Sequence, residues 1–403
     1  MSVLSIVIPA YNEERGLGAI IERVLSVRSE LADVGIADME LIVVDDGSQD
    51  ETAAIASGYT DVKLIRHSVN QGYGAALKTG FRNAQGDLLA FLDADGTYPP
   101  EHFPHLCLAA LEDEADLVIG SRMAGTESDM PLVRRIGNYV FAGLVTLLGN
   151  HRVTDSASGM RVLKREALAS LYPLPDGLNF TPVMSTRALH EGLRWVETPI
   201  PYEERAGRSK LSVVRDGTRF LYTIVWTALN YNPVRVLGGL GLGLGAIASM
   251  IAALIVVARL SGITQLGPWG VVSVFLASLC AVAGVTLFSL GATFNYLVSL
   301  FHKQPIRQGL FGRPLFRTPL YRRFGWLGLL GMVGGLTVAA ASIAMSLQGW
   351  AIERLWFYLL GAAMLLLVGL QLVVFWIIIG VLDELSRREL HIADDIGEIP
   401  GEM

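Results

Sequence analysis

The second half of the chain alternates long apolar runs with short polar links. Four runs follow Tyr231, and each exceeds the roughly 20 residues that a helix needs to cross the hydrocarbon core of a membrane. They are Val236–Ala258, Gly270–Phe301, Gly325–Leu347 and Leu355–Leu382. Core helices of a soluble protein are the alternative, but four such runs in succession favour membrane spans. None has an acidic or basic residue near its middle, as a transport pathway would.

The first half has a shorter period, in which brief apolar runs alternate with amphipathic segments. Strands interleaved with helices in this way predict a mostly parallel α/β sheet covered by helices on both faces. The predicted strands are Leu4–Pro9, Glu40–Asp45, Val62–Arg66, Leu88–Asp93 and Asp116–Gly120, and the predicted helices include Glu14–Leu31, Gly72–Asn83 and Glu101–Glu114. Ligands of such sheets bind beyond the carboxyl ends of the strands.

Two further apolar stretches are too short to span a membrane. Leu211–Pro233 is rich in aromatic residues and carries three charges, which predicts a helix lying in the membrane interface. Tyr139–Leu148 follows Arg134 and Arg135, and both a core helix and a membrane-resting helix fit it. We therefore expect an α/β domain over 1–210, juxtamembrane interfacial helices over 211–235, a four-span domain over 236–390 and a tail over 391–403.

Charge changes this picture in two ways. The link His302–Phe324 holds six basic residues and no acidic one, so the positive-inside rule places it and both termini in the cytoplasm. We accordingly expect a multi-pass protein of the cell membrane with a cytoplasmic catalytic domain. The net charge of −6 argues against nucleic-acid binding, and two cysteines imply neither a disulfide framework nor a multi-cysteine metal site. The glycines from Gly238 onward suit close helix packing, and a homo-oligomer is compatible with them.

Polar residues concentrate just after the predicted strands. The sharpest feature is the pair Asp93 and Asp95, which follows an apolar strand. Two carboxylates at a strand end suit Mg²⁺ or Mn²⁺, which commonly bridge such groups to substrate phosphates. A solvated turn is the simpler reading of Asp-x-Asp alone, but a second acidic pair, Asp45 and Asp46, at the end of the predicted strand Glu40–Asp45 favours the metal.

Four ordered motifs carry a family resemblance over about residues 3–215. They read VIPAYNEE, VVDDGSQDET, NQGYGAAL and FLDAD, and they resemble the family-2 glycosyltransferases with the GT-A fold. Within that family, GSR at 120–122, PLVRR at 131–135, SGMR at 158–161 and RAGRSKL at 205–211 are similar to dolichol-phosphate-mannose synthase and bacterial polyprenyl-phosphate glycosyltransferases.

This resemblance implies a role for particular residues. The nucleotide-sugar would be held by Pro9, Tyr11, Glu13, Asp45 and Asp93, and by Arg205, Ser209 and Lys210 from the loop before the membrane. The divalent metal would be held by Asp93 and Asp95, whereas Thr97 stands where the synthase often has a glutamine ligand. The lipid phosphate would be held by Arg122 and Arg134, with Asn138 in place of a serine.

The chemistry of the reaction agrees with these residue types. A departing diphosphate develops charge that a metal and basic side chains stabilise. A hydroxyl acceptor would need a general base, whereas a lipid phosphate is already anionic and suits arginine forks. Asp155 could serve as such a base or as the partner that orients Arg161, and both readings stay open.

Two functions therefore compete. The first is an inverting, metal-dependent transferase that moves a hexose from GDP-mannose or UDP-glucose to dolichyl or undecaprenyl phosphate at the cytoplasmic membrane face. The second is a processive membrane polysaccharide synthase. Such synthases usually carry a Q-x-x-R-W motif, whereas Glu191-Gly192-Leu193-Arg194-Trp195 lacks the glutamine, which counts against the second function.

Overall fold

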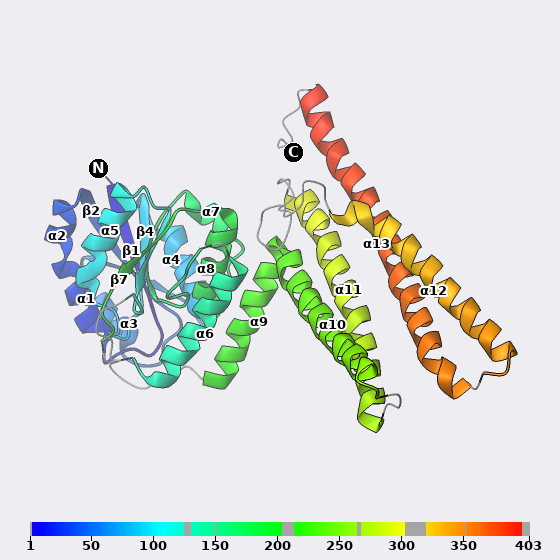
Figure 1. The fold of residues 1–403 in the computed structure, drawn as a ribbon. Coiled ribbons are helices and arrows are strands. Elements are labelled where there is room, and N and C mark those ends of the chain that lie inside the picture. The colour runs from blue at the N-terminus through cyan, green and yellow to red at the C-terminus, as the bar shows by residue number, and fades with distance from the viewer. Residues whose placement is uncertain are drawn as a thin grey trace. The chain divides into compact units, whose positions relative to one another are not determined.

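The computed structural model describes residues 2–124, 130–149, 151–203, 213–263, 267–302, 320–350 and 352–396. The chain divides into two compact units, Met1–Ala228 and Leu229–Met403. The first unit holds an α/β sheet and the second consists of long helices (Figure 1).

The sheet of the first unit has seven strands within the described residues, in the order β3-β2-β1-β4-β6-β5-β7. All neighbours pair in parallel except β6, which runs antiparallel to both β4 and β5. The strands are β1 (Ser2–Ala10), β2 (Ile36–Asp45), β3 (Val62–Arg66), β4 (Leu88–Leu92), β5 (Leu117–Ser121), β6 (Met160–Lys164) and β7 (Trp195–Pro199). This confirms the predicted mostly parallel α/β fold of the GT-A type and the five predicted strands.

Both faces of the sheet are buried because alternate residues of each central strand face opposite cores. Ile6 and Ile8 of β1 belong to one core and Val7 to the other. The first core includes residues of α1 (Leu17–Ser26), α2 (Arg28–Asp33), α3 (Thr52–Ser57) and α5 (Phe103–Glu112), which follows the short turn η1 (Pro100–His102). The second includes residues of α4 (Tyr73–Asn83), α7 (Ala167–Leu171) and α8 (Phe180–Glu191).

Two amphipathic helices complete this unit, α6 (Leu132–Leu148) and α9 (Val213–Tyr231). They pack together through Phe141 and Phe220, whose ring centroids lie 5.7 Å apart. Ala142 and Val145 of α6 are buried, but its other face leaves large apolar side chains exposed: Leu132, Val133, Ile136, Tyr139, Val140 and Leu147. The segment Tyr139–Leu148 is therefore not a fully buried core helix.

The second unit has four helices, among the described residues, that are long and apolar enough to cross a membrane: Val234–Leu260, Pro268–Phe301, Phe324–Leu347 and Leu355–Leu385. They lie in η2 (Val234–Gly238) with α10 (Gly239–Leu260), in α11 (Pro268–His302), in α12 (Phe324–Leu347), which follows η3 (Leu320–Arg323), and in α13 (Ile352–Ile396). The four predicted spans thus correspond to four helices.

Glycines bring these helices close together in pairs. A Cβ atom on Gly241 of α10 would lie 2.6 Å from the carbonyl oxygen of Gly284 in α11. A Cβ atom on Gly328 of α12 would lie equally close to the carbonyl oxygen of Gly369 in α13. Because a side chain at either position would force the backbones apart, both helix pairs depend on glycine at the contact.

Candidate active site

The loops after β1 and β2 are joined into one wall at the carboxyl ends of these strands. The backbone N–H of Asn12 donates to Ser48 Oγ at 2.9 Å, and that of Glu13 donates to Thr52 Oγ1 at 2.8 Å. Asn12 Oδ1 in turn accepts from the backbone N–H of Gln49 at 2.9 Å. These bonds fix the first motif, residues 9–14, against the second.

A cavity of about 550 Å³ opens beside this wall. Its lining residues are Tyr11, Gly47, Ser48, Gln49, Arg66, His67, Ser68, Val69 and Asn70. Tyr11, one of the residues predicted to hold the nucleotide, lines this cavity, whereas Pro9, Glu13 and Asp45 are not among its lining residues. Asp45 is fully buried, and its carboxylate accepts from the Ser48 N–H at 2.9 Å and from Arg66 Nε at 3.3 Å.

Asp93 and Asp95 follow β4 and are both oriented by hydroxyl donors. The Tyr73 hydroxyl donates to Asp93 Oδ1 at 2.7 Å, and the Thr97 hydroxyl donates to Asp95 Oδ1 at 2.6 Å. Burial and the neighbouring Asp93 raise the pKa of Tyr73 well above its usual value, so this phenol stays a donor. Thr97 is buried, and both its hydroxyl and its backbone N–H donate to Asp95.

The two carboxylates fit a divalent cation that arrives with a diphosphate. No group of three or more His, Cys, Asp or Glu side chains suited to a metal occurs among the residues that the structure describes. A site with only two carboxylates is typical of Mg²⁺ or Mn²⁺, which keep water ligands and complete their shell with substrate phosphate oxygens. The donor set at Asp93 and Asp95 therefore suits this kind of ion.

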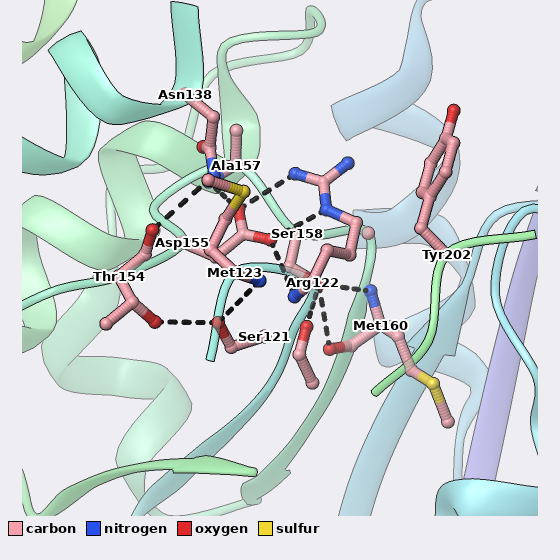
Figure 2. A network of polar contacts seen from close by, with 12 residues as sticks. Ser121, Arg122, Met123, Asn138, Thr154, Asp155, Ala157, Ser158, Met160 and Tyr202 are labelled. Carbon is pink, nitrogen blue, oxygen red and sulfur yellow. Dashed lines mark hydrogen bonds and ion pairs between the residues drawn. The ribbon is translucent and has the colours of Figure 1, made fainter. Parts of the chain in front are cut away.

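Arg122, at the end of β5, forms a bidentate ion pair with Asp155 (Figure 2). Arg122 Nε and NH2 lie 2.6 Å and 2.8 Å from the two carboxylate oxygens, and the Arg122 backbone N–H donates to the same group at 3.2 Å. Burial alone would raise the pKa of Asp155, but the Arg122 guanidinium and the surrounding N–H donors lower it below its usual range. Asp155 is thus an ionised partner of Arg122.

Arg161, the second residue of β6, is fully buried. Its Nε and NH2 donate to the carbonyl oxygens of Ser158 and Ser156 at 3.0 Å and 2.9 Å, while its NH1 has no hydrogen-bond partner among the described residues. Burial lowers the pKa of Arg161 to about 10. The sequence left two roles open for Asp155, a general base and the partner that orients Arg161. The hydrogen bonds support neither role, because the bidentate partner of Asp155 is Arg122.

The turn that carries Asp155 is fixed by Glu197 of β7. Both Glu197 carboxylate oxygens accept from the Thr154 backbone N–H at 3.0 Å, and one accepts from the Asp155 N–H at 3.3 Å. The Thr154 hydroxyl also lies 2.7 Å from the hydroxyl of Ser121, the residue before Arg122. The position of Arg122 is therefore fixed by two contacts with this turn, one from its neighbour Ser121 to Thr154 and one from its own side chain to Asp155 (Figure 2).

Arg134 and Asn138 approach this pair from α6. Arg134 NH1 donates to the Tyr202 hydroxyl at 3.0 Å, and the Arg122 guanidinium lies 5.9 Å from the centre of the Tyr202 ring. Asn138 is buried, with Nδ2 3.5 Å from the Thr154 carbonyl oxygen and Oδ1 without a partner among the described residues. The structure thus brings together the three residues predicted to hold a lipid phosphate.

Tyr202 is a residue that the sequence analysis missed. It lies 68 residues from Arg134 in the chain and three positions before Arg205, where the RAGRSKL motif begins, and this proximity was the only signal for it. Arg205, Ser209 and Lys210 of that motif lie outside the described residues.

Comparisons with protein-family models match two parts of this chain. A family model described as glycosyl transferase family 2 matches residues 5–172, and one described as a domain of unknown function (DUF8752) matches residues 233–393.

Individual relatives cover more of the chain. The dolichyl-phosphate hexose transferase of Haloferax volcanii is 31% identical over 56% of this chain and 94% of its own length. The low-salt glycan biosynthesis hexosyltransferase Agl6 of the same organism is 31% identical over 72% of this chain and 67% of its own length. The undecaprenyl-phosphate 4-deoxy-4-formamido-L-arabinose transferase of Photorhabdus laumondii is 27% identical over 76% of this chain and 92% of its own length.

Proposed function

The chain belongs to glycosyl transferase family 2 and is a glycosyltransferase, and from this premise we propose that it transfers one hexose from a nucleotide-sugar to a polyprenyl phosphate. The observation that supports this acceptor most directly is the buried pair of Arg122 and Asp155. The named activities of the dolichyl-phosphate and undecaprenyl-phosphate relatives support the same acceptor class.

The Arg122–Asp155 pair supports a phosphate acceptor over a hydroxyl acceptor. A sugar hydroxyl must lose a proton as it attacks, so its transferase needs a general base. Asp155 is the buried carboxylate in contact with the acceptor-side arginine, but it is held ionised by that arginine with a lowered pKa and is a poor base. A phosphate monoester is already anionic near pH 7 and needs positioning only.

Arg122 and Arg134 supply that positioning. Asp155 engages Nε and NH2 of Arg122, so NH1 lies outside the pair, and Tyr202 contacts both arginines. A guanidinium binds phosphate oxygens with a planar fork, which gives both charge and orientation. We expect the lipid phosphate to lie against these two side chains.

The reaction then needs one bond to form and one to break. A phosphate oxygen of the lipid attacks C1 of the hexose, and the bond from C1 to the nucleoside diphosphate breaks, with its electron pair leaving on the diphosphate oxygen. Attack opposite the leaving group inverts the anomeric centre, and no proton is transferred. Asp93 and Asp95 would hold a Mg²⁺ or Mn²⁺ ion, which neutralises charge on the departing diphosphate.

The direct test supplies purified full-length protein in detergent with undecaprenyl phosphate or dolichyl phosphate and Mg²⁺ or Mn²⁺. Radiolabelled GDP-mannose and UDP-glucose are offered separately. We expect label in the organic phase from one donor, in a product with a single hexose per lipid. Label in a growing polymer instead, with no lipid-linked monosaccharide, would support the processive polysaccharide synthase and overturn this proposal.

The membrane placement is the second part of the proposal. Helix α9 ends at Tyr231, and the first candidate span begins at Val234, so the end of α9 lies at the membrane surface if that helix spans. Tyr222 and Trp226 of α9 are exposed and stack with ring centroids 5.8 Å apart. Together with the basic loops of the second half, this supports an interfacial position and a cytoplasmic catalytic domain.

Helix α6 provides a test of this placement. Val133 and Val140 are 58% and 57% exposed on its apolar face, and α6 packs on α9. Replacing both by glutamate is expected to lower transfer to undecaprenyl phosphate in vesicles by about tenfold or more, since charge opposes insertion of an apolar face. Transfer to the short, water-soluble citronellyl phosphate should be unchanged.

The matched control is Leu111→Glu on α5, another exposed apolar residue. It should alter neither activity. An equal loss on both acceptors in the α6 variant would point to damage of the site and contradict the membrane role of this face.

A further inference from the structure

Asp93 is confined on two sides. On one side the Tyr73 hydroxyl donates to its Oδ1 at 2.7 Å. On the other side stands the backbone of Gly159, where an added Cβ atom would lie 2.2 Å from Asp93 Oδ2. Gly159 is itself anchored, because its N–H donates to the Tyr98 hydroxyl at 2.7 Å. The carboxylate therefore has little freedom to rotate.

Tyr73 is held firmly enough to act as a fixed donor. It is the first residue of α4, and the next two backbone N–H groups, of Gly74 and Ala75, donate to the Asp176 carbonyl oxygen at 2.7 Å and 3.1 Å. A Cβ atom on Gly74 would lie 2.1 Å from the Pro175 carbonyl oxygen, so helix and loop are in direct contact. The Tyr73 ring also packs edge-on against Phe180 of α8, with centroids 6.4 Å apart.

The glycine-rich start of α4 is thus occupied by contacts with the loop at Asp176. Two N–H groups of its first turn, those of Gly74 and Ala75, already donate to the Asp176 carbonyl oxygen, so they are not directed at a ligand. The group of this segment that contacts the site is the phenol of Tyr73, which donates to Asp93 after β4.

We propose that Tyr73 is a positioning residue for Asp93, holding its carboxylate in the orientation that binds the divalent cation of the donor complex. This inference rests on the proposed function, because the cation accompanies the nucleotide-sugar. Tyr73 does not touch the cation in this arrangement and acts through Asp93 alone. Mutation of a residue that hydrogen-bonds to a metal ligand commonly lowers metal affinity or activity by about 10–100-fold.

The test is Tyr73→Phe, which removes the hydroxyl and keeps the ring against Phe180. Mn²⁺ binding to the full-length protein is measured by electron paramagnetic resonance, with saturating GDP and, separately, UDP. We expect the affinity for Mn²⁺ to fall by about 10–100-fold with whichever nucleotide the wild type binds. The KM for the lipid phosphate and the thermal unfolding midpoint without metal should stay close to the wild-type values.

Tyr59→Phe is the matched control. It removes another phenol hydroxyl that donates to a carboxylate, here to Glu22 at 3.1 Å rather than to Asp93. It should leave Mn²⁺ binding unchanged. Unaltered Mn²⁺ affinity in Tyr73→Phe overturns the inference, as does a wild type that binds no Mn²⁺ with either nucleotide. A wild type that binds Mn²⁺ but makes no lipid-linked sugar overturns the proposed acceptor and leaves the positioning role standing.

Discussion

Asp95→Ala is expected to lower the rate of sugar transfer by about 10²–10³-fold, which corresponds to roughly 3–4 kcal/mol of transition-state stabilisation. The physical reason is loss of one of the two carboxylates that fit the cation on the departing diphosphate. The measurement is initial rate of lipid-linked product at saturating donor, lipid and Mn²⁺.

A second substitution separates catalysis from folding at this position. Asp95 accepts hydrogen bonds from the backbone N–H and the hydroxyl of Thr97, at 3.1 Å and 2.6 Å, so alanine also removes the acceptor of a buried hydroxyl. Asp95→Asn keeps an acceptor oxygen and loses the charge. Both variants should lose transfer, but the unfolding temperature should fall more in the alanine variant.

The surface variant Asp61→Ala serves as the control, because Asp61 is 60% exposed and lies 4.0 Å from its partner Arg28. It should be as active as the wild type. Retention of more than about a tenth of the wild-type rate in Asp95→Asn, at saturating Mn²⁺, would contradict a metal role for this carboxylate.

Asp155→Asn is expected to destabilise the catalytic domain by about 3–5 kcal/mol, since it leaves the buried Arg122 without its counter-charge. For a domain of this size, that loss lowers the unfolding midpoint by on the order of 10 °C. Thermal unfolding of the full-length protein in detergent measures it. The KM for the lipid phosphate should rise as well, because Arg122 loses the group that orients its fork.

The pH dependence of this effect has a definite sign. The pKa of Asp155 is lower in the folded protein than its ordinary value of 3.8. The pair therefore contributes its full stability above about pH 5 and loses it as the pH falls through the folded pKa, below 3.8. The difference in unfolding temperature between wild type and Asp155→Asn should shrink in that acidic range.

The exposed pair of Glu114 and Arg194 provides the comparison. These side chains lie 2.8 Å apart but are 76% and 62% exposed, so Glu114→Gln should change stability by less than about 1 kcal/mol. A similarly small effect of Asp155→Asn would show that the buried pair is not a stabilising element and would weaken its assigned role.

The parts of the site that were predictable from sequence are those set by local pattern. Asp93 and Asp95 follow a continuous apolar run, and β4 is buried throughout its length. In a parallel sheet such a run places the next residues at the ligand-binding edge, whatever the tertiary details. The same logic placed Asp45 and Arg122 at the ends of β2 and β5.

The parts that were not predictable depend on contacts between distant segments. Nothing in the local sequence distinguishes Arg122 from Arg161 as the partner of Asp155, because both choices place a carboxylate near an arginine. Tyr73 was equally consistent with an ordinary core aromatic, and only its contact with Asp93, 20 residues away, shows otherwise. Strand β6 was missed as well, since five residues with two basic side chains carry little strand signal.

The reversed direction of β6 has a consequence for how such an enzyme can change. Met160, the first residue of β6, pairs with Leu92 at the end of β4, so the turn that precedes β6 enters the site. Because β5 and β6 are antiparallel neighbours, β5 ends and β6 begins at the same end of the sheet, and Arg134, Asn138 and Asp155 lie between them in the chain. We therefore expect changes in the length of this segment to alter the proposed acceptor site, while the pairing of β1, β2 and β4 stays the same.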